Sequence, residues 1–311
     1  MELRYGILST SSIAPRFIAA VRESKTGTVA ALSSRTWEKA HAKAKEWNIP
    51  TAYGSHEALL SDETINIVYI SNVNARHYPW AKAALLAGKH VICEKPCTTT
   101  QAHTKELYEL AREKGLFFME AQKMLFLPAV LAVKEHLADL GDVTMAQCSH
   151  SFPGSYNGWM FDAEAGGGPL LSSGIYALQL MAWLFGGIGE VSGTASKLPT
   201  GVEWQYILTG CTKTGILFSA KNSTRAVLDN TCRIFGERGY IELPEYWKAR
   251  KAVFHIDGKT EVLEFPCEHE LVYEVRHIAQ CLEQGLLTSP VITEDLSLQA
   301  IRAIEKIKAE W

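Results

Sequence analysis

A glutamate, a lysine and a proline in succession, Glu94-Lys95-Pro96, are the residues of this chain best suited by type and position to chemistry. The segment before them, Gly88-Lys89-His90-Val91-Ile92-Cys93, is typical of a helix-terminating glycine followed by a short buried strand. The proline fixes the backbone and prevents the strand from continuing. In a parallel sheet, the Glu-Lys pair then lies at the carboxyl end of a strand, where open α/β sheets bind ligands.

The turn after the first predicted strand, residues 3–8, reads Ser9-Thr10-Ser11-Ser12-Ile13-Ala14. A dinucleotide-binding fingerprint has glycine at positions 9 and 11 and a small residue at 14, so only Ala14 agrees with it. Backbone N–H groups at a helix N-terminus nevertheless bind phosphate whatever the side chains are. We therefore expect residues 9–13 (Ser9, Thr10, Ser11, Ser12, Ile13) to hold a pyrophosphate, the alternative being a polar turn without a ligand.

The second predicted strand, residues 28–32, is followed by Ser33-Ser34-Arg35. NAD-selective sites have a carboxylate here, whereas an arginine accommodates the 2′-phosphate of NADP. The first acidic residue is Glu38, already inside the next predicted helix. Two hydroxyls and a guanidinium therefore favour NADP(H), with NAD(H) as the other candidate; a solvated surface arginine is the alternative for Arg35.

Polar side chains also follow the third predicted strand, residues 65–70. Ser71 and Asn72 come directly after it, and His77 follows shortly. At this edge of the sheet they are expected to contact the ribose or the nicotinamide. The alternative is structural: Asn72 or Asn74 caps the next helix, and His77 packs nearby.

The elements that position these residues alternate through the first 120 or so residues. Strands are predicted at 3–8, 28–32, 65–70, 90–93 and 116–119, and helices at 13–22, 37–47, 57–60, 78–86 and 100–114. Ser55 has the position of a helix N-cap, and Gly115 that of a helix-terminating residue. This alternation predicts an α/β fold with a Rossmann-like, doubly wound parallel sheet.

The pattern changes after Pro128. Helices at 129–139 and 170–185 surround a strand at 143–150, alternating strands fill the next 80 or so residues, and helices at 268–282 and 293–308 close the chain. We expect an α+β domain with an open, largely antiparallel sheet. The predicted domains are 1–122 for dinucleotide binding and 123–311 for substrate binding and dimerisation, with the last helix returning to the first domain.

Composition limits the partners. The net charge is −3, and no apolar run approaches the roughly 20 residues that span a bilayer, so neither nucleic acid nor a membrane is expected. The seven cysteines are scattered and never spaced as C-x-x-C, which argues against a disulfide framework or a metal site. This use of cysteine indicates a reducing compartment, so we expect a cytoplasmic protein; the N-terminus also enters a strand directly, without signal-peptide features.

In this order, the motifs resemble those of the oxidoreductase family that includes glucose-fructose oxidoreductase and inositol dehydrogenase. Residues 87–96 are very similar to that family's Glu-Lys-Pro signature. Residues 116–121 and 126–129, and the segments 161–162, 166–171 and 174–176, resemble the dimeric dihydrodiol dehydrogenase subgroup. The resemblance covers residues 1 to about 190.

The resemblance implies an NAD(P)-dependent enzyme that moves a hydride between a nicotinamide and a hydroxyl or carbonyl of a sugar, polyol or dihydrodiol. It implies that Lys95 lies beside the nicotinamide and the substrate hydroxyl, and that Tyr176 is the second proton-transfer residue. A lysine beside an oxidised nicotinamide has its ammonium form disfavoured, so Lys95 is a plausible proton acceptor, or donor in reduction. Glu94 is expected to orient Lys95 or hold the carboxamide.

The chain also departs from the family. Ser172 replaces an acidic residue four positions before Tyr176, and Gln122-Lys123-Met124-Leu125 replaces an aromatic-to-arginine pattern. Lys123 is a candidate for stabilising an alkoxide, or else a solvent-facing lysine. Trp159 is a candidate platform for a sugar ring, or else a core residue.

Two other functions remain open at this point. The loss of the acid at 172 favours a catalytically inactive dinucleotide-bound sensor or regulatory protein, while retention of Lys95 and Tyr176 argues against it. A nicotinamide-dependent glycosidase is the weaker option.

The strands between residues 202 and 265 are rich in apolar side chains, and the second domain has few helices to cover them. An uncovered apolar sheet is usually buried against a partner. We therefore expect a two-fold homodimer packed sheet against sheet, with a tetramer as a further option. The apolar residues meant here are Trp204, Tyr206, Ile207, Leu208, Ile216, Leu217 and Phe218.

Overall fold

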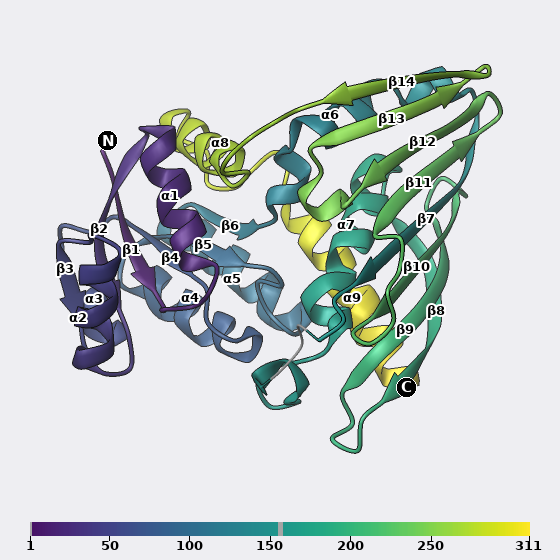
Figure 1. The fold of residues 1–311 in the computed structure, drawn as a ribbon. Helices are drawn as coiled ribbons and strands as arrows, with labels where there is room; N and C mark the ends of the chain where they lie inside the picture. Colours follow the sequence, from purple (N-terminus) through teal and green to yellow (C-terminus); the bar gives the residue numbers. More distant parts are fainter. Residues whose placement is uncertain (1, 155–157) are drawn as a thin grey trace. The chain divides into compact units, whose positions relative to one another are not determined.

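The computed structural model describes residues 2–154 and 158–311 and divides the chain into two compact units (Figure 1). Unit 1 contains the chain up to Gln122 together with His269–Glu294. Unit 2 contains Lys123–Glu268 and Asp295–Trp311. Each unit is built on one sheet.

The sheet of unit 1 has six parallel strands in the order β3-β2-β1-β4-β5-β6. Since all strands run the same way, their carboxyl ends lie along one edge. The short strand β3 is the one that the sequence did not predict. The strands are β1 Leu3–Leu8, β2 Gly27–Ser33, β3 Thr51–Tyr53, β4 Ile67–Ile70, β5 His90–Glu94 and β6 Phe118–Ala121.

Helices begin and end in unit 1 largely where local signals predict. The hydroxyl of Ser55 accepts the N–H of Ala58, and Gly115 has the left-handed conformation that terminates a helix. The helices are α1 Ala14–Ser24, α2 Trp37–Glu46, α3 His56–Leu60, α4 His77–Leu86, α5 Gln101–Lys114 and α8 Val272–Glu283, with a 3₁₀ turn at Asn74–Arg76.

Both faces of the unit 1 sheet are covered. On one face, Phe17 of α1 stacks on Tyr69 of β4, with ring centroids 3.7 Å apart. On the other face, strand residues such as Ile70 and Cys93 pack in one cluster with residues of α4 and α5. This cover on both faces explains why β4 is buried along its whole length.

The sheet of unit 2 has eight strands in the order β14-β13-β12-β11-β7-β10-β9-β8. Its pairings are antiparallel except for β7 with β10. The fold class predicted for both parts of the chain is therefore confirmed. The strands are β7 Val143–Ser151, β8 Ile188–Lys197, β9 Glu203–Thr212, β10 Leu217–Ser223, β11 Thr231–Gly236, β12 Gly239–Pro244, β13 Lys251–Ile256 and β14 Lys259–Glu264.

Helices lie on one face of this sheet only, as Figure 1 shows for α6, α7 and α9. Tyr206, Leu208 and Phe218 are buried on that face, whereas Ile207 and Leu217 are exposed on the other. The helices and turns are α6 Pro128–Glu135, α7 Ile175–Leu184, α9 Glu294–Glu310, the 3₁₀ turns Lys123–Phe126, Leu137–Leu140, Gly158–Phe161 and Tyr246–Lys248, and a π-helical turn at Leu170–Gly174.

The end of the chain differs from the expectation. It is α8, not the last helix, that belongs to unit 1, where Glu270 just before it forms an ion pair with Arg16 of α1. The last helix, α9, belongs to unit 2, where the Gln299 side chain accepts the N–H of Ile188 at 2.8 Å. Both helices are amphipathic, so the sequence pattern alone does not assign their packing partners.

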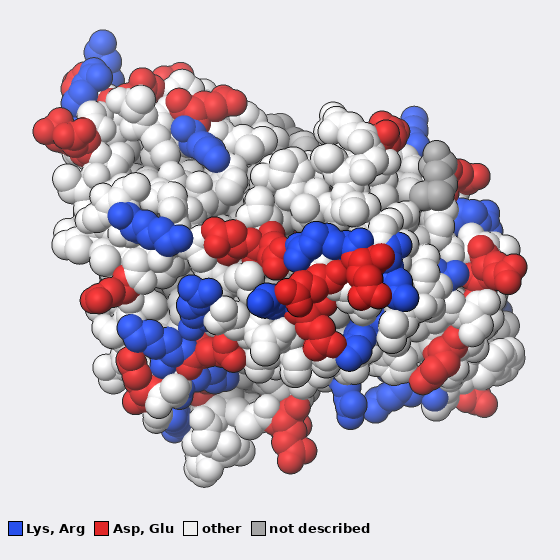
Figure 2. All heavy atoms as spheres, turned by 180° about the vertical axis from the view of Figure 1, so that it is seen from behind, with Lys and Arg blue, Asp and Glu red and all other residues white. Residues whose placement is uncertain are grey.

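Within residues 2–154 and 158–311, no helix has both the length and the apolar character needed to cross a membrane. On the face shown in Figure 2, basic and acidic side chains are intermixed. Such a surface provides no extended positive field for nucleic acid on that face.

Candidate cofactor and catalytic site

In the turn after β1, Ser9 has a backbone conformation that is more usual for glycine. Ser9 has a φ of 153°, in the region that non-glycine residues seldom adopt. Its Oγ accepts the N–H of Ser11 at 3.0 Å, and the Ser11 hydroxyl donates to Ser71 Oγ at 2.8 Å. The serines thus join the loops after β1 and β4 at the N-terminal end of α1. Thr10 and Ile13 are partly exposed there and Ser12 is exposed.

His56, which was not among the predicted site residues, contacts both the end of β2 and the loop after β4. Ser33 Oγ lies 2.7 Å from His56 Nδ1, and Asn72 Nδ2 lies 3.3 Å from His56 Nε2. An imidazole protonated at Nδ1 satisfies both contacts, since Nδ1–H donates to the serine and Nε2 accepts from the amide. Burial lowers the pKa of His56, in agreement with this neutral form.

One buried acceptor next to this network, Asn72 Oδ1, has no hydrogen-bond donor within the described residues. A buried amide oxygen without a partner is costly, which makes it a natural acceptor for a ligand hydroxyl or N–H. The strand-end residues therefore fit a nicotinamide dinucleotide.

The three residues predicted to contact a 2′-phosphate, Ser33, Ser34 and Arg35, differ in exposure. Ser33 is fully buried, and its hydroxyl is engaged by His56 and the Ile7 carbonyl. Ser34 is also buried, while Arg35 is exposed. Of the three predicted residues, Arg35 is therefore the one whose side chain is exposed to a 2′-phosphate.

The segment from Glu94 to Pro96 is held from both sides. The Tyr69 hydroxyl donates to Glu94 Oε1 at 2.6 Å. His77 Nδ1 lies 2.8 Å from the Pro96 carbonyl, and His77 Nε2 lies 2.9 Å from the Asn72 carbonyl. His77 is buried and contacts both the loop after β4 and the loop after β5. It therefore packs as expected and also lies beside the candidate site residues.

Lys95 is partly buried, and this burial lowers the pKa of its ammonium group, while the carboxylates of Glu94 and Glu120 oppose the shift. Glu120, at the third position of β6, is itself buried, and its Oε1 accepts the N–H of Cys97 at 2.9 Å. Sequence position alone does not assign Glu120 to the site, because only the pairing of β5 with β6 reveals where it lies.

The other candidates belong to unit 2. Lys123 is 7% exposed, so it is not a solvent-facing lysine. Trp159 lies in the turn at 158–161 and is partly exposed, so it is not a buried core residue. The Ser172 hydroxyl donates to the Gly168 carbonyl at 2.8 Å, and Tyr176 is buried in the first turn of α7.

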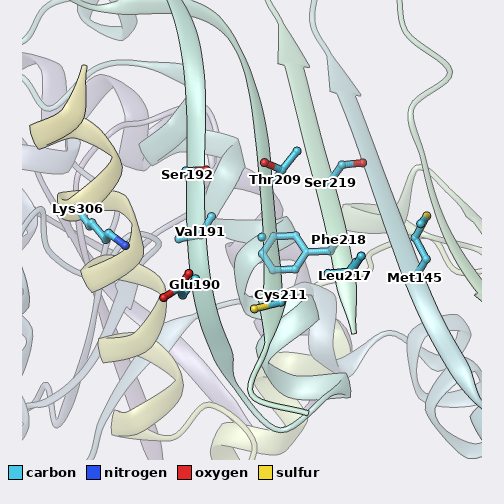
Figure 3. A pocket seen from close by; sticks show the side chains of 11 residues that line it. Met145, Glu190, Val191, Ser192, Thr209, Cys211, Leu217, Phe218, Ser219 and Lys306 are labelled. Carbon is cyan, nitrogen blue, oxygen red and sulfur yellow. The ribbon is translucent and has the colours of Figure 1, made fainter. Parts of the chain in front are cut away.

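A pocket of about 510 Å³ lies on the sheet of unit 2 and is shown in Figure 3. It is lined by side chains of β7, β8, β9 and β10 and by Lys306 of α9. No residue predicted for catalysis or cofactor binding is among its described lining residues. The pocket is thus distinct from the candidate catalytic and cofactor-binding residues.

Comparison with known proteins decides the family. Residues 3–122 match the profile of the oxidoreductase family with an NAD-binding Rossmann fold, and residues 130–242 match the GFO/IDH/MocA C-terminal domain. The chain belongs to this family. The resemblance seen in the sequence is confirmed, and the GFO/IDH/MocA chain is a nicotinamide-dependent oxidoreductase that transfers a hydride.

Relatives extend over nearly the whole GFO/IDH/MocA chain. Trans-1,2-dihydrobenzene-1,2-diol dehydrogenase of Mus musculus is 31% identical over 318 residues, with 94% of this chain and 92% of the relative covered. A 3-ketoreductase from Actinomadura kijaniata, solved with NADP and TDP-benzene, has a TM-score of 0.89 at 22% identity, covering 99% and 98%. Levoglucosan dehydrogenase, solved with NADH and levoglucosan, has a TM-score of 0.90 at 18% identity, covering 100% and 98%. The two structures show a shared fold.

Proposed function

We propose that this oxidoreductase interconverts a hydroxyl and a carbonyl on a sugar, polyol or dihydrodiol, with NADP(H) as the preferred cofactor. The observation that carries the proposal is the Glu94–Lys95 pair at the carboxyl edge of the sheet, fixed by Tyr69 on one side and by His77 on the other. The substrate class is supported by relatives whose names specify a dihydrodiol and levoglucosan.

The chain's own residues would bind the dinucleotide along this edge. N–H groups at the start of α1 and the Ser11 hydroxyl suit a pyrophosphate, and Asn72 Oδ1 offers an acceptor. Arg35 and Ser34 support the preference for NADP(H), because no carboxylate follows β2 before Glu38. The nicotinamide supplies hydride chemistry when bound, and the protein manages the proton.

Lys95 would take the proton from a substrate hydroxyl in oxidation and return it in reduction. Its lowered pKa favours this exchange, because a proton carrier works best when its pKa lies near the working pH. Glu94, held by Tyr69, orients the segment. The Tyr176 hydroxyl serves as the second proton carrier, and Lys123 and Trp159 are proposed to contact the substrate.

The experiment is turnover with a panel of substrates. We expect purified protein to oxidise NADPH with at least one keto-sugar or diketone, or to reduce NADP⁺ with a polyol or dihydrodiol. The progress is followed by nicotinamide absorbance. Binding of NADPH without turnover on the whole panel would contradict the proposal.

That outcome would favour the alternative, a dinucleotide-bound sensor. Its structural support is Ser172, whose hydroxyl donates to a backbone carbonyl where relatives are expected to offer a carboxylate. The Tyr69 hydroxyl contacts Glu94, and His77 contacts the Pro96 carbonyl, so the segment that carries Lys95 is fixed, which favours the enzyme.

The proposal includes a two-fold homodimer. Helices lie on one face of the unit 2 sheet, and Tyr206, Leu208 and Phe218 are buried. The opposite face still exposes Met145, Ile207 and Leu217, and the pocket of Figure 3 is lined partly by these strands. Light scattering should give about twice the chain mass of 34.4 kDa; the monomer mass at micromolar concentration would rule the dimer out.

We also propose a cytoplasmic location. All seven cysteines are free thiols, and most are buried. Free cysteines are usual in reducing compartments. Fractionation of the source cells, with immunodetection of the chain, tests this location.

A further inference from the structure

Two carboxylates flank the strand end that carries Lys95, and they approach it from opposite faces of the sheet. In the pairing of β5 with β6, Cys93 is opposite Glu120, and Glu94 is opposite Ala121. Because successive side chains of a strand alternate between faces, Glu120 shares a face with Cys93, and Glu94 projects to the other. Glu94 accordingly meets Tyr69, which is opposite Ile92 in the register.

Glu120 contacts the segment that follows Lys95. Its Oε1 accepts the N–H of Cys97 at 2.9 Å, and its side chain is 1% exposed. A carboxylate hydrogen bond to backbone in a buried setting is stronger than an ordinary one. The residues from Lys95 to Cys97 are therefore fixed between His77, which contacts the Pro96 carbonyl, and Glu120.

We propose that Glu120 is a positioning residue for Lys95: it fixes the backbone after Lys95 and places a second negative charge beside the ammonium, on the face opposite Glu94. The inference rests on the proposed role of Lys95 as the proton carrier. It gives a function to Glu120, which lies in the segment 116–121 and for which the sequence predicted no chemical role.

The charges around Lys95 within unit 1 give the electrostatic consequence. Burial lowers the pKa of Lys95, and Glu94 and Glu120 both raise it. His77 faces the same region, where burial lowers its pKa and its contacts with the Pro96 and Asn72 carbonyls oppose that shift. Burial raises the pKa of the Cys93 and Cys97 thiols, which therefore stay uncharged at neutral pH. Glu120 thus limits how far the lysine pKa falls.

The test uses cofactor binding and needs no substrate. An ammonium beside the nicotinamide disfavours NADP⁺, which is positively charged at the ring, relative to NADPH. The ratio of the two dissociation constants, measured by titration across pH, should therefore change through an inflection at the pKa of Lys95. In Glu120→Gln, which keeps an oxygen for the Cys97 N–H but removes the charge, we expect the inflection to move about one pH unit lower.

Three variants make the result decisive. Lys95→Met should abolish the inflection, and Glu113→Gln, an equal charge change on the exposed face of α5, should leave it in place. Glu120→Asp keeps the charge at a shorter reach, so it should move the inflection less than Glu120→Gln and serves if the latter does not fold.

The outcomes separate the two proposals. If Lys95→Met abolishes the inflection but both Glu120 variants superimpose on the wild type, the role of Glu120 is refuted and that of Lys95 stands. If Lys95→Met keeps the inflection, or the wild type has none, Lys95 does not lie beside the nicotinamide and both proposals are overturned.

Discussion

In unit 1 helices cover both faces of the sheet and β4 is buried throughout, whereas in unit 2 helices cover one face and β9 alternates between buried and exposed residues. A sheet covered on both faces leaves only its edge for a ligand, and the candidate cofactor residues are at that edge. A sheet covered on one face has two different surfaces. The candidate Tyr176 is on α7, on the covered face, and the proposed dimer contact is the uncovered face. The number of sheet faces covered by helices thus determines where each unit can bind a ligand or a partner.

The two faces of β9 and β10 are expected to respond very differently to truncation. Leu208→Ala removes a fully buried side chain and should lower the free energy of unfolding by about 2–5 kcal/mol. Leu217→Ala, at a position 55% exposed, should change the stability of the isolated chain by less than about 0.5 kcal/mol and weaken dimerisation instead. Denaturant titration and light scattering measure the two effects; equal destabilisation would remove the distinction between the faces.

The edge of the unit 1 sheet is expected to respond through affinity. Arg35→Ala should weaken NADPH binding by roughly 10- to 100-fold, as for a lost hydrogen bond to a charged group worth about 1.5–3 kcal/mol. NADH, which lacks the 2′-phosphate, should lose less than about threefold. Fluorescence titration compares them, with Arg22→Ala on the outer surface of α1 as control. An equal loss for both cofactors would show that Arg35 does not contact the 2′-phosphate.

The smallest effect concerns the backbone of the first turn. Ser9→Ala keeps the strained φ and loses the hydrogen bond to Ser11, so it should cost about 1 kcal/mol of stability. Ser9→Gly loses the same bond but relieves the strain, and should stay within about 0.5 kcal/mol of the wild type. Thermal unfolding of both variants distinguishes them; a glycine variant less stable than the alanine one would contradict the strain argument.

Local signals predicted much of the fold. The Ser55 cap and the Gly115 terminus are set by neighbouring residues alone, and both are confirmed. The three-residue strand β3 is too short to show a periodicity. The assignment of α8 to unit 1 depends on contacts with α1, far away in the sequence.

The same distinction holds for the site. Glu94 and Lys95 were found because strand, charge and proline are adjacent in the chain. His56 and Glu120 were missed because their roles arise from partners in other segments of the chain, Ser33 and Asn72 for the first and Cys97 for the second. The position of Ser33 in the sequence predicts contact with a phosphate, but it does not reveal that the serine hydroxyl is bonded to His56.

The central claim is that Lys95 carries the proton, and the direct measurement is the turnover of Lys95→Met on a substrate found in the panel. We expect kcat to fall by roughly 100-fold or more, while NADPH affinity and the unfolding transition stay close to wild type. Tyr176→Phe should lower kcat less, since Lys95 remains. A Lys95→Met enzyme with near wild-type kcat would contradict the account, whatever cofactor it binds.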